Sequence, residues 1–202
     1  MAQDGLRHGG LGADAAHLCI DMQGLFTGGS AWHTPWLERV LPVVERLAAA
    51  RPERTIFTRF IPPNRPGEGE GRWRAYWERW AEMTLERLPP GATELLPPLA
   101  RLVPPAEVID KRFYSPWHGT DLHARLQARG IGTLIVTGAE TDVCVLGAVL
   151  GAVDHGYRVV VPTDALCSSS DSTHDALLTL YRERYGQQVE TATAEEVLRA
   201  WR

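Results

Sequence analysis

Cys144 lies at a position in the sequence where a reactive thiol can be built. The run Thr133-Leu-Ile-Val-Thr-Gly138 predicts a buried strand, and Ala139-Glu-Thr-Asp-Val-Cys144 leads from it into a helix of small residues. If Thr141 or Asp142 caps that helix, the thiol belongs to its first turn, where free N–H groups and the positive end of the helix dipole favour the thiolate. The same N–H groups can hold an oxyanion. A cysteine that is buried only for packing is the alternative.

Two ionisable residues are predicted at the ends of other strands. Asp21 follows the apolar run 15–20, and Lys111 follows the run 107–110. In an open parallel sheet the carboxyl ends of the strands form one edge, where sites are commonly built. Taken alone, a strand-end aspartate is usually a turn residue and a strand-end lysine is usually solvated. Only together with Cys144 do the two residues indicate a site.

Three motifs resemble those of the isochorismatase-like cysteine hydrolases, the superfamily that contains nicotinamidases and N-carbamoylsarcosine amidases. The motifs are Cys-Ile-Asp-Met-Gln at 19–23, Asp-Lys-Arg-Phe-Tyr-Ser at 110–115 with Thr-Asp-Leu at 120–122, and Gly-Ala-Glu-Thr-Asp-Val-Cys-Val at 138–145. Segments 156–160 and 163–167 also fit, and the motifs follow the order of the family over about residues 15–185. The resemblance implies a catalytic triad of Asp21, Lys111 and Cys144.

The resemblance also implies how the backbone and the triad act. A non-proline cis peptide bond is expected between Ala139 and Glu140, and the N–H groups of Glu140 and Cys144 are expected to form the oxyanion hole. Asp21 would then take the thiol proton, Lys111 would favour the thiolate, and Cys144 would attack a carbonyl carbon to give a thioester. This chemistry requires no cofactor.

The sequence also suggests residues that contact the substrate: Phe26, Arg59, Trp117 and His118. Phe26 belongs to a Gly-rich segment that forms either a loop over the pocket or an ordinary connection. The metal-binding nicotinamidases have Asp-x-His where this chain has Thr58-Arg59-Phe60, so we expect no metal. Arg59 can instead bind a substrate carboxylate or pair with a loop acid.

A tryptophan stripe precedes the predicted third strand. Trp73, Trp77 and Trp80 recur at i, i+4 and i+7 and predict one aromatic face of a helix. This face either packs in the core or in a dimer interface, or it forms a wall of the substrate pocket.

The order of the elements predicts an α/β fold. Strand-like runs occur at 16–20, 54–60, 106–110, 132–138 and 157–161, and they alternate with helical patterns at about 35–50, 72–88, 120–130, 142–155 and 171–185. A short strand near 187–190 and a terminal helix follow. Such alternation predicts a parallel sheet covered on both faces. The family resemblance implies a Rossmann-like three-layer α/β/α sandwich with a six-stranded parallel sheet.

The composition sets limits on organisation and partners. The chain has 202 residues, of which 44% are hydrophobic, and this predicts one hydrolase domain over 15–202 after a flexible Gly-rich N-terminus at 1–14. A net charge of −4 gives no basis for binding nucleic acid or an anionic membrane, so we expect a small-molecule substrate. The odd number of cysteines and the lack of a signal-like or membrane-spanning run favour a cytoplasmic protein. The resemblance suggests a homodimer or a higher homo-oligomer.

Three functions compete at this point. The first is hydrolysis of a C–N bond in a small amide or carbamoyl compound by Cys144. The second is isochorismatase activity, the hydrolysis of a vinyl ether, which needs no thiol; the presence of Cys144 favours the amidase. The third is a non-catalytic binding subunit, because a fold by itself does not determine a function.

Overall fold

The structure, a computed structural model, describes residues 5–202 and is built on a parallel β-sheet. The strands run in the order β3-β2-β1-β4-β5-β7, every pairing between them is parallel, and the short β6 pairs with the end of β4. The predicted α/β fold with a parallel sheet is confirmed, with one additional two-residue strand. The strands are β1 (Ala15–Ile20), β2 (Thr55–Phe60), β3 (Glu107–Lys111), β4 (Thr133–Ala139), β5 (Arg158–Pro162), β6 (Leu166–Cys167) and β7 (Val189–Ala192).

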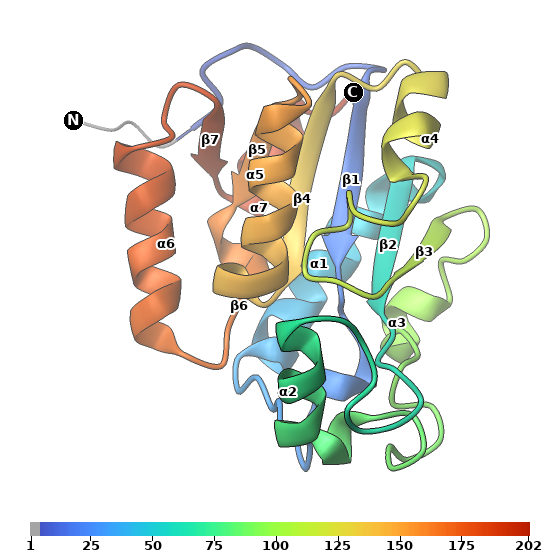
Figure 1. Cartoon of the computed structure of the whole chain (residues 1–202). Helices are drawn as coiled ribbons and strands as arrows, with labels where there is room; N and C mark the ends of the chain where they lie inside the picture. The colour runs from blue at the N-terminus through green and yellow to red at the C-terminus, as the bar shows by residue number, and fades with distance from the viewer. Residues whose placement is uncertain (1–4) are drawn as a thin grey trace.

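Helices cover both faces of the sheet, which makes three layers (Figure 1). Helices α1, α3 and α7 pack on one face around one apolar cluster, and α4, α5 and α6 pack on the other around a second cluster. Helix α2 covers neither face and lies beyond the carboxyl ends of the strands (Figure 1). The helices are α1 (Leu37–Ala50), α2 (Arg72–Arg79), α3 (Pro97–Ala100), α4 (Leu122–Ala128), α5 (Leu146–Asp154), α6 (Asp171–Glu183) and α7 (Ala194–Ala200).

The apolar pattern of the sequence explains this layering. All residues of β1 and β4 are buried, as expected for central strands that are covered on both faces. Helix α1 instead buries one stripe, Leu37, Val40, Val44 and Leu47, which follows the helical period. None of the helices in residues 5–202 is long and apolar enough to cross a bilayer.

The predicted helix over 72–88 is too long. Helix α2 ends at Arg79, and a 3₁₀ turn at Ala81–Met83 follows. The chain then turns because Leu85 donates its N–H to Pro63 O and Glu86 donates to Asn64 O, contacts that a continued helix would not allow. The sequence pattern therefore overestimated this helix, and α3 and β6 were not predicted.

Part of the N-terminal segment that was predicted to be flexible contacts the rest of the domain. Within the part of 1–14 that the structure describes, Leu11 is buried and donates its N–H to Ala200 O at 3.0 Å. Arg7 donates to the Glu190 carboxylate through its N–H and to Val189 O through its guanidinium. Residues 5–14 are therefore bound to the edge of the domain, and the prediction for residues 1–4 lies outside the described residues.

Candidate active site

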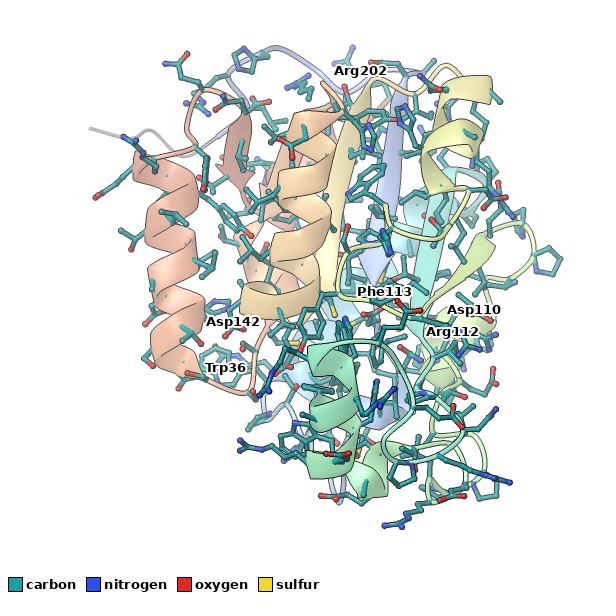
Figure 2. The ribbon with its side chains drawn as sticks, viewed as in Figure 1. Trp36, Asp110, Arg112, Phe113, Asp142 and Arg202 are labelled. Carbon is teal, nitrogen blue, oxygen red and sulfur yellow. The ribbon has the colours of Figure 1, made fainter. Side chains whose placement is uncertain are left out.

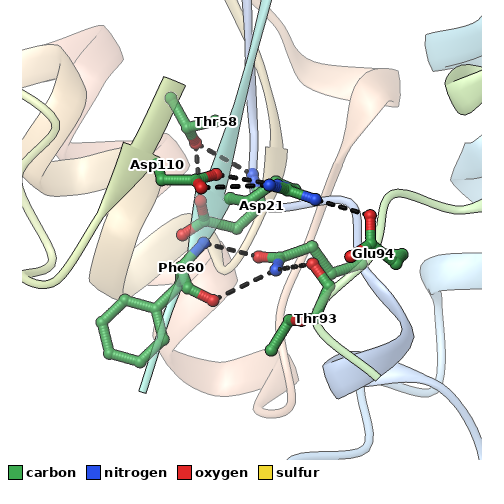
Figure 3. Close-up of polar contacts among 8 residues, drawn as sticks. Asp21, Thr58, Phe60, Thr93, Glu94 and Asp110 are labelled. Carbon is green, nitrogen blue, oxygen red and sulfur yellow. Dashed lines mark hydrogen bonds and ion pairs between the residues drawn. The ribbon is translucent and has the colours of Figure 1, made fainter. Parts of the chain in front are cut away.

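Asp21 directly follows β1 and turns its carboxylate into the interior. Its backbone has a positive φ of 49°, a conformation that aspartate tolerates better than most side chains do. The hydroxyl of Thr58, on the neighbouring strand β2, donates to Asp21 Oδ1 at 2.6 Å (Figure 3). The Asp21 N–H donates to Thr58 O at 3.2 Å. Strand β2 therefore fixes both the backbone and the side chain of Asp21.

Lys111 is the last residue of β3 and forms a buried ion pair with Asp21. Its Nζ lies 2.7 Å from Asp21 Oδ2, and both side chains are 0% exposed. Nζ also donates to Phe113 O at 3.0 Å and lies 5.0 Å from the centroid of the Phe60 ring. Burial alone would lower the pKa of Lys111, but its interactions with Asp21 and Cys144 outweigh burial and raise the pKa, so Lys111 is an ammonium.

Cys144 lies beside this pair, in a π-helical turn (Thr141–Val145) that leads from β4 into α5. Its thiol interacts with the side chains of both Asp21 and Lys111. Burial raises the pKa of Cys144, Lys111 lowers it and Asp21 raises it again, and the net result lies well above the pKa of a free cysteine. Burial and Asp21 therefore favour the thiol, whereas Lys111 favours the thiolate. The reactivity of Cys144 stays a prediction.

The predicted caps of this helix are wrong. The N-cap position is Glu140, which makes no side-chain capping bond. The Thr141 hydroxyl instead donates to Cys167 O at 3.1 Å. The Asp142 carboxylate accepts hydrogen bonds from the hydroxyl groups of Ser168 and Thr173. Asp142 thereby joins the turn to the start of α6 (Figure 2).

The backbone before Cys144 has two special features. The peptide bond between Ala139 and Glu140 is cis. Gly138 has a φ of +109°, and a Cβ atom there would overlap the backbone of Ile20 on β1. Only glycine allows β4 to end this close to β1, which brings the turn that contains Cys144 next to Asp21.

Cys144 opens onto a cavity of about 290 Å³ at the carboxyl edge of the sheet. Phe26 lines the cavity, as predicted. Most of the lining is aromatic, and the residues come from the segment after β1, from β2, from α2 and its end, and from the turns after β3, β4 and β6. The lining residues are Phe26, Ala31, Trp32, Phe60, Tyr76, Trp80, Tyr114, Glu140, Val143, Cys144 and Ser169.

Arg59 does not line this cavity, contrary to the prediction. Its guanidinium donates to both carboxylate oxygens of Asp110, at 2.8 and 3.0 Å, and to Glu94 at 2.5 Å (Figure 3). Successive residues of a strand project to opposite sides, so Thr58 and Phe60 project toward the site whereas Arg59 projects away. Arg59 therefore pairs with two acids of the protein, Asp110 on β3 and Glu94 in the loop before α3, and only the second is the loop acid of the alternative prediction.

Trp117 and His118 also lie outside the cavity. The Trp117 indole donates to Ala148 O at 2.9 Å, and a Cβ at Gly151 would overlap its ring. The glycines of α5 thus let the segment after β3 pack on this helix. His118 packs on Phe113, with 4.6 Å between ring centroids, and faces a different hollow. Both residues belong to the loop that follows Lys111, and their side chains pack away from the cavity.

The tryptophan stripe divides between core and cavity. Trp77 is buried, whereas Trp80 lines the cavity together with Tyr76. Trp32, in the segment before α1, contacts this helix with 5.9 Å between its ring centroid and that of Trp80. The sequence analysis did not assign Thr58, Trp32, Phe60 or Tyr114 to the site. The alternation of β2 could have indicated Thr58 and Phe60, but no local pattern indicates Trp32 or Tyr114.

The residues present do not fit a metal ion at the position used by the metal-binding nicotinamidases. Phe60 stands where the pattern has its histidine, and its ring lies against Lys111 and Trp77. Within residues 5–202, no three His, Cys, Asp or Glu side chains come together in a way that could hold a metal.

The fold is a three-layer α/β/α sandwich, and an Asp–Lys pair lies beside a cysteine at the carboxyl edge of its sheet. This combination is typical of an α/β hydrolytic enzyme with a cysteine at its site. The sequence profile of the Isochorismatase domain matches residues 15–194, so the chain belongs to the isochorismatase family. It is 30% identical to a maleamate amidohydrolase of Pseudomonas putida, over 94% of this chain and 89% of that protein.

Two further comparisons concern one relative in sequence and one in structure. The chain is 29% identical to an N-carbamoylsarcosine amidase of Arthrobacter, over 78% of this chain and 61% of that protein, which is less than two thirds of its length. The crystal structure of a cysteine hydrolase from Pseudomonas syringae pv. phaseolicola superposes with a TM-score of 0.84, over 99% of this chain and 98% of that one, at 24% identity. The second comparison supports the fold.

Proposed function

We propose that the protein hydrolyses a C–N bond in a small amide or carbamoyl compound through Cys144, Asp21 and Lys111. The observation that carries this proposal is the fully buried Lys111–Asp21 pair, 2.7 Å apart, beside the only cysteine that lines the cavity in the described chain. Relatives named as an amidohydrolase and an amidase support the reaction class. A cavity of about 290 Å³ is suited to a small substrate.

Asp21 acts as the general base because burial favours the protonated form of the Cys144 thiol. It accepts the Cys144 proton while sulfur attacks the carbonyl carbon, and the carbonyl oxygen becomes an oxyanion. Lys111 stays cationic and stabilises the negative charge that passes between sulfur and carboxylate. The N–H groups of Glu140 and Cys144 are the donors that we assign to the oxyanion.

The second half of the reaction reverses these proton transfers. Asp21 gives its proton to the leaving nitrogen as the C–N bond breaks, which leaves a thioester on Cys144. Water then loses a proton to Asp21 and attacks the thioester, and the C–S bond breaks. The acid product leaves, and Asp21 returns its proton to the Cys144 thiolate.

Intact-protein mass spectrometry during turnover tests this mechanism. A panel of primary amides and carbamoyl compounds should include at least one that adds the mass of its acyl group to the wild-type protein and none that adds mass to Cys144→Ala. Hydrolysis that continues in Cys144→Ala, above all of isochorismate, would show that the thiol is not the nucleophile. A folded protein that binds panel members without any adduct or turnover would support a binding subunit instead.

A further inference from the structure

The cavity above Cys144 has an unusual combination of charge and aromatic surface. Six aromatic side chains line it, and among the lining residues Glu140 is the only acidic or basic one. Burial raises the pKa of Glu140, as expected for a carboxylate without a cation partner. Arg59, the cation that sequence analysis assigned to the substrate, is bound to Asp110 and Glu94 outside the cavity. The aromatic residues are Phe26, Trp32, Phe60, Tyr76, Trp80 and Tyr114.

The rings support one another, so the aromatic walls are formed before a ligand binds. Trp32 is at the centre, with its ring centroid 6.3 Å from Phe26, 6.0 Å from Phe60 and 5.9 Å from Trp80. Tyr76 lies 6.3 Å from Trp32. The faces of aromatic rings carry negative partial charge and attract cations, most strongly when the cation is removed from water.

Glu140 adds a carboxylate to these walls and has no cation to balance it. Its Oε1 accepts the N–H of Ser169 at 3.0 Å, and no lysine or arginine of the described chain forms an ion pair with it. Lys111, the only buried lysine or arginine of the described chain, is paired with Asp21. A carboxylate beside aromatic ring faces is a suitable site for a positive charge supplied by a ligand.

We propose that the substrate carries a small alkylammonium group, which the six aromatic residues surround and which Glu140 balances. This inference rests on the proposed function, because the amide carbonyl must reach Cys144 while the ammonium group occupies the rest of the cavity. A substrate with a carboxylate in that place would lose its hydration beside Glu140 and find no cation there, so anionic amides bind weakly.

A matched pair of ligands tests the charge directly. Glycine betaine amide and 3,3-dimethylbutanamide have the same shape and differ in a quaternary nitrogen or a quaternary carbon. Titration calorimetry with the non-reacting Cys144→Ala variant should give a Kd about tenfold lower for the cationic amide. Succinamate, the anionic probe, should bind more weakly than either.

Two variants locate the preference. Glu140→Gln keeps an oxygen that can accept the Ser169 N–H but removes the charge, and it should reduce the tenfold preference to a few-fold. Trp32→Leu should weaken the cationic amide more than the neutral one. Trp36→Leu is the matched control, since Trp36 follows in the same segment, is 41% exposed and does not line the cavity (Figure 2). Thermal melting checks that each variant is folded.

Equal or tighter binding of the neutral amide, or a preference that Glu140→Gln leaves unchanged, would overturn this inference. Such a result would leave the proposed hydrolase function standing if acyl adducts still form. Conversely, a cation preference in a wild-type protein that shows neither adduct nor turnover would keep the cation-binding site but refute the hydrolase.

Discussion

The hydroxyl of Thr58 is expected to be essential for efficient catalysis although it does not line the cavity. Thr58 is 0% exposed and donates to Asp21 Oδ1 at 2.6 Å. Thr58→Val keeps the shape of the side chain and removes this hydrogen bond, so the proposed base loses the group that orients it. A hydrogen bond to a charged group contributes about 1.5–3 kcal/mol. If that stabilisation is lost mainly in the transition state, kcat/KM falls roughly 10- to 150-fold.

Steady-state kinetics on a turned-over amide measure this effect. The loss should appear in kcat with little change in KM, because Thr58 positions Asp21 and does not contact the substrate. Thr58→Ser restores the hydroxyl and should recover most of the activity, which a purely structural role of the methyl group would not explain.

Thr55→Val provides the matched control on the same strand. Thr55 is also 0% exposed, but its hydroxyl donates to Arg51 O at 3.0 Å, away from the site. The kcat of Thr55→Val should stay within about twofold of that of the wild type. The positioning role of Thr58 would be refuted by a folded Thr58→Val protein with normal kcat, or by an equal loss in both valine variants.

Four further predictions follow from the site and the core. Asp21→Asn and Lys111→Ala should each lower kcat by about 10²–10⁴-fold in kinetic assays, whereas near-normal rates would exclude the triad. Iodoacetamide should modify Cys144 before the other two cysteines, because only Cys144 lines the cavity, and peptide mapping that finds another site labelled first would contradict this. Activity should survive chelation by EDTA, since Phe60 occupies the place of a metal-binding histidine. If EDTA abolished turnover and zinc or iron restored it, metal-independent catalysis would be disproved. Burial lowers the pKa of His17 to about 3, so the unfolded chain binds the proton first and stability falls as pH drops below about 6.5. Between about pH 7 and pH 5 this costs about 2 kcal/mol of unfolding free energy in urea titrations, and a His17→Gln protein that loses just as much would refute the assignment.

The sequence by itself determined the sheet and the residues that its strands place at one edge. Apolar runs such as 133–138 alternate with helical patterns, and this local periodicity is sufficient to predict a parallel sheet covered on both faces. Parallel strands end at a common edge, so Asp21, Lys111 and Cys144 could be expected at the same edge of the sheet, and the family resemblance implied that they form one triad. The structure places them together because β1 lies at the centre of the sheet, between β2 and β4.

Only the tertiary structure decided what surrounds these groups. The sequence left Arg59 open between a substrate carboxylate and an acid of the protein. The alternation of β2 directs Arg59 to Asp110 and brings Thr58 to Asp21. The cavity combines segments that are far apart in the chain, such as Trp32 and Tyr114, and no local period encodes their approach. The pKa of Cys144 likewise depends on burial and on the charges of Asp21 and Lys111, which a local reading of its helix does not include.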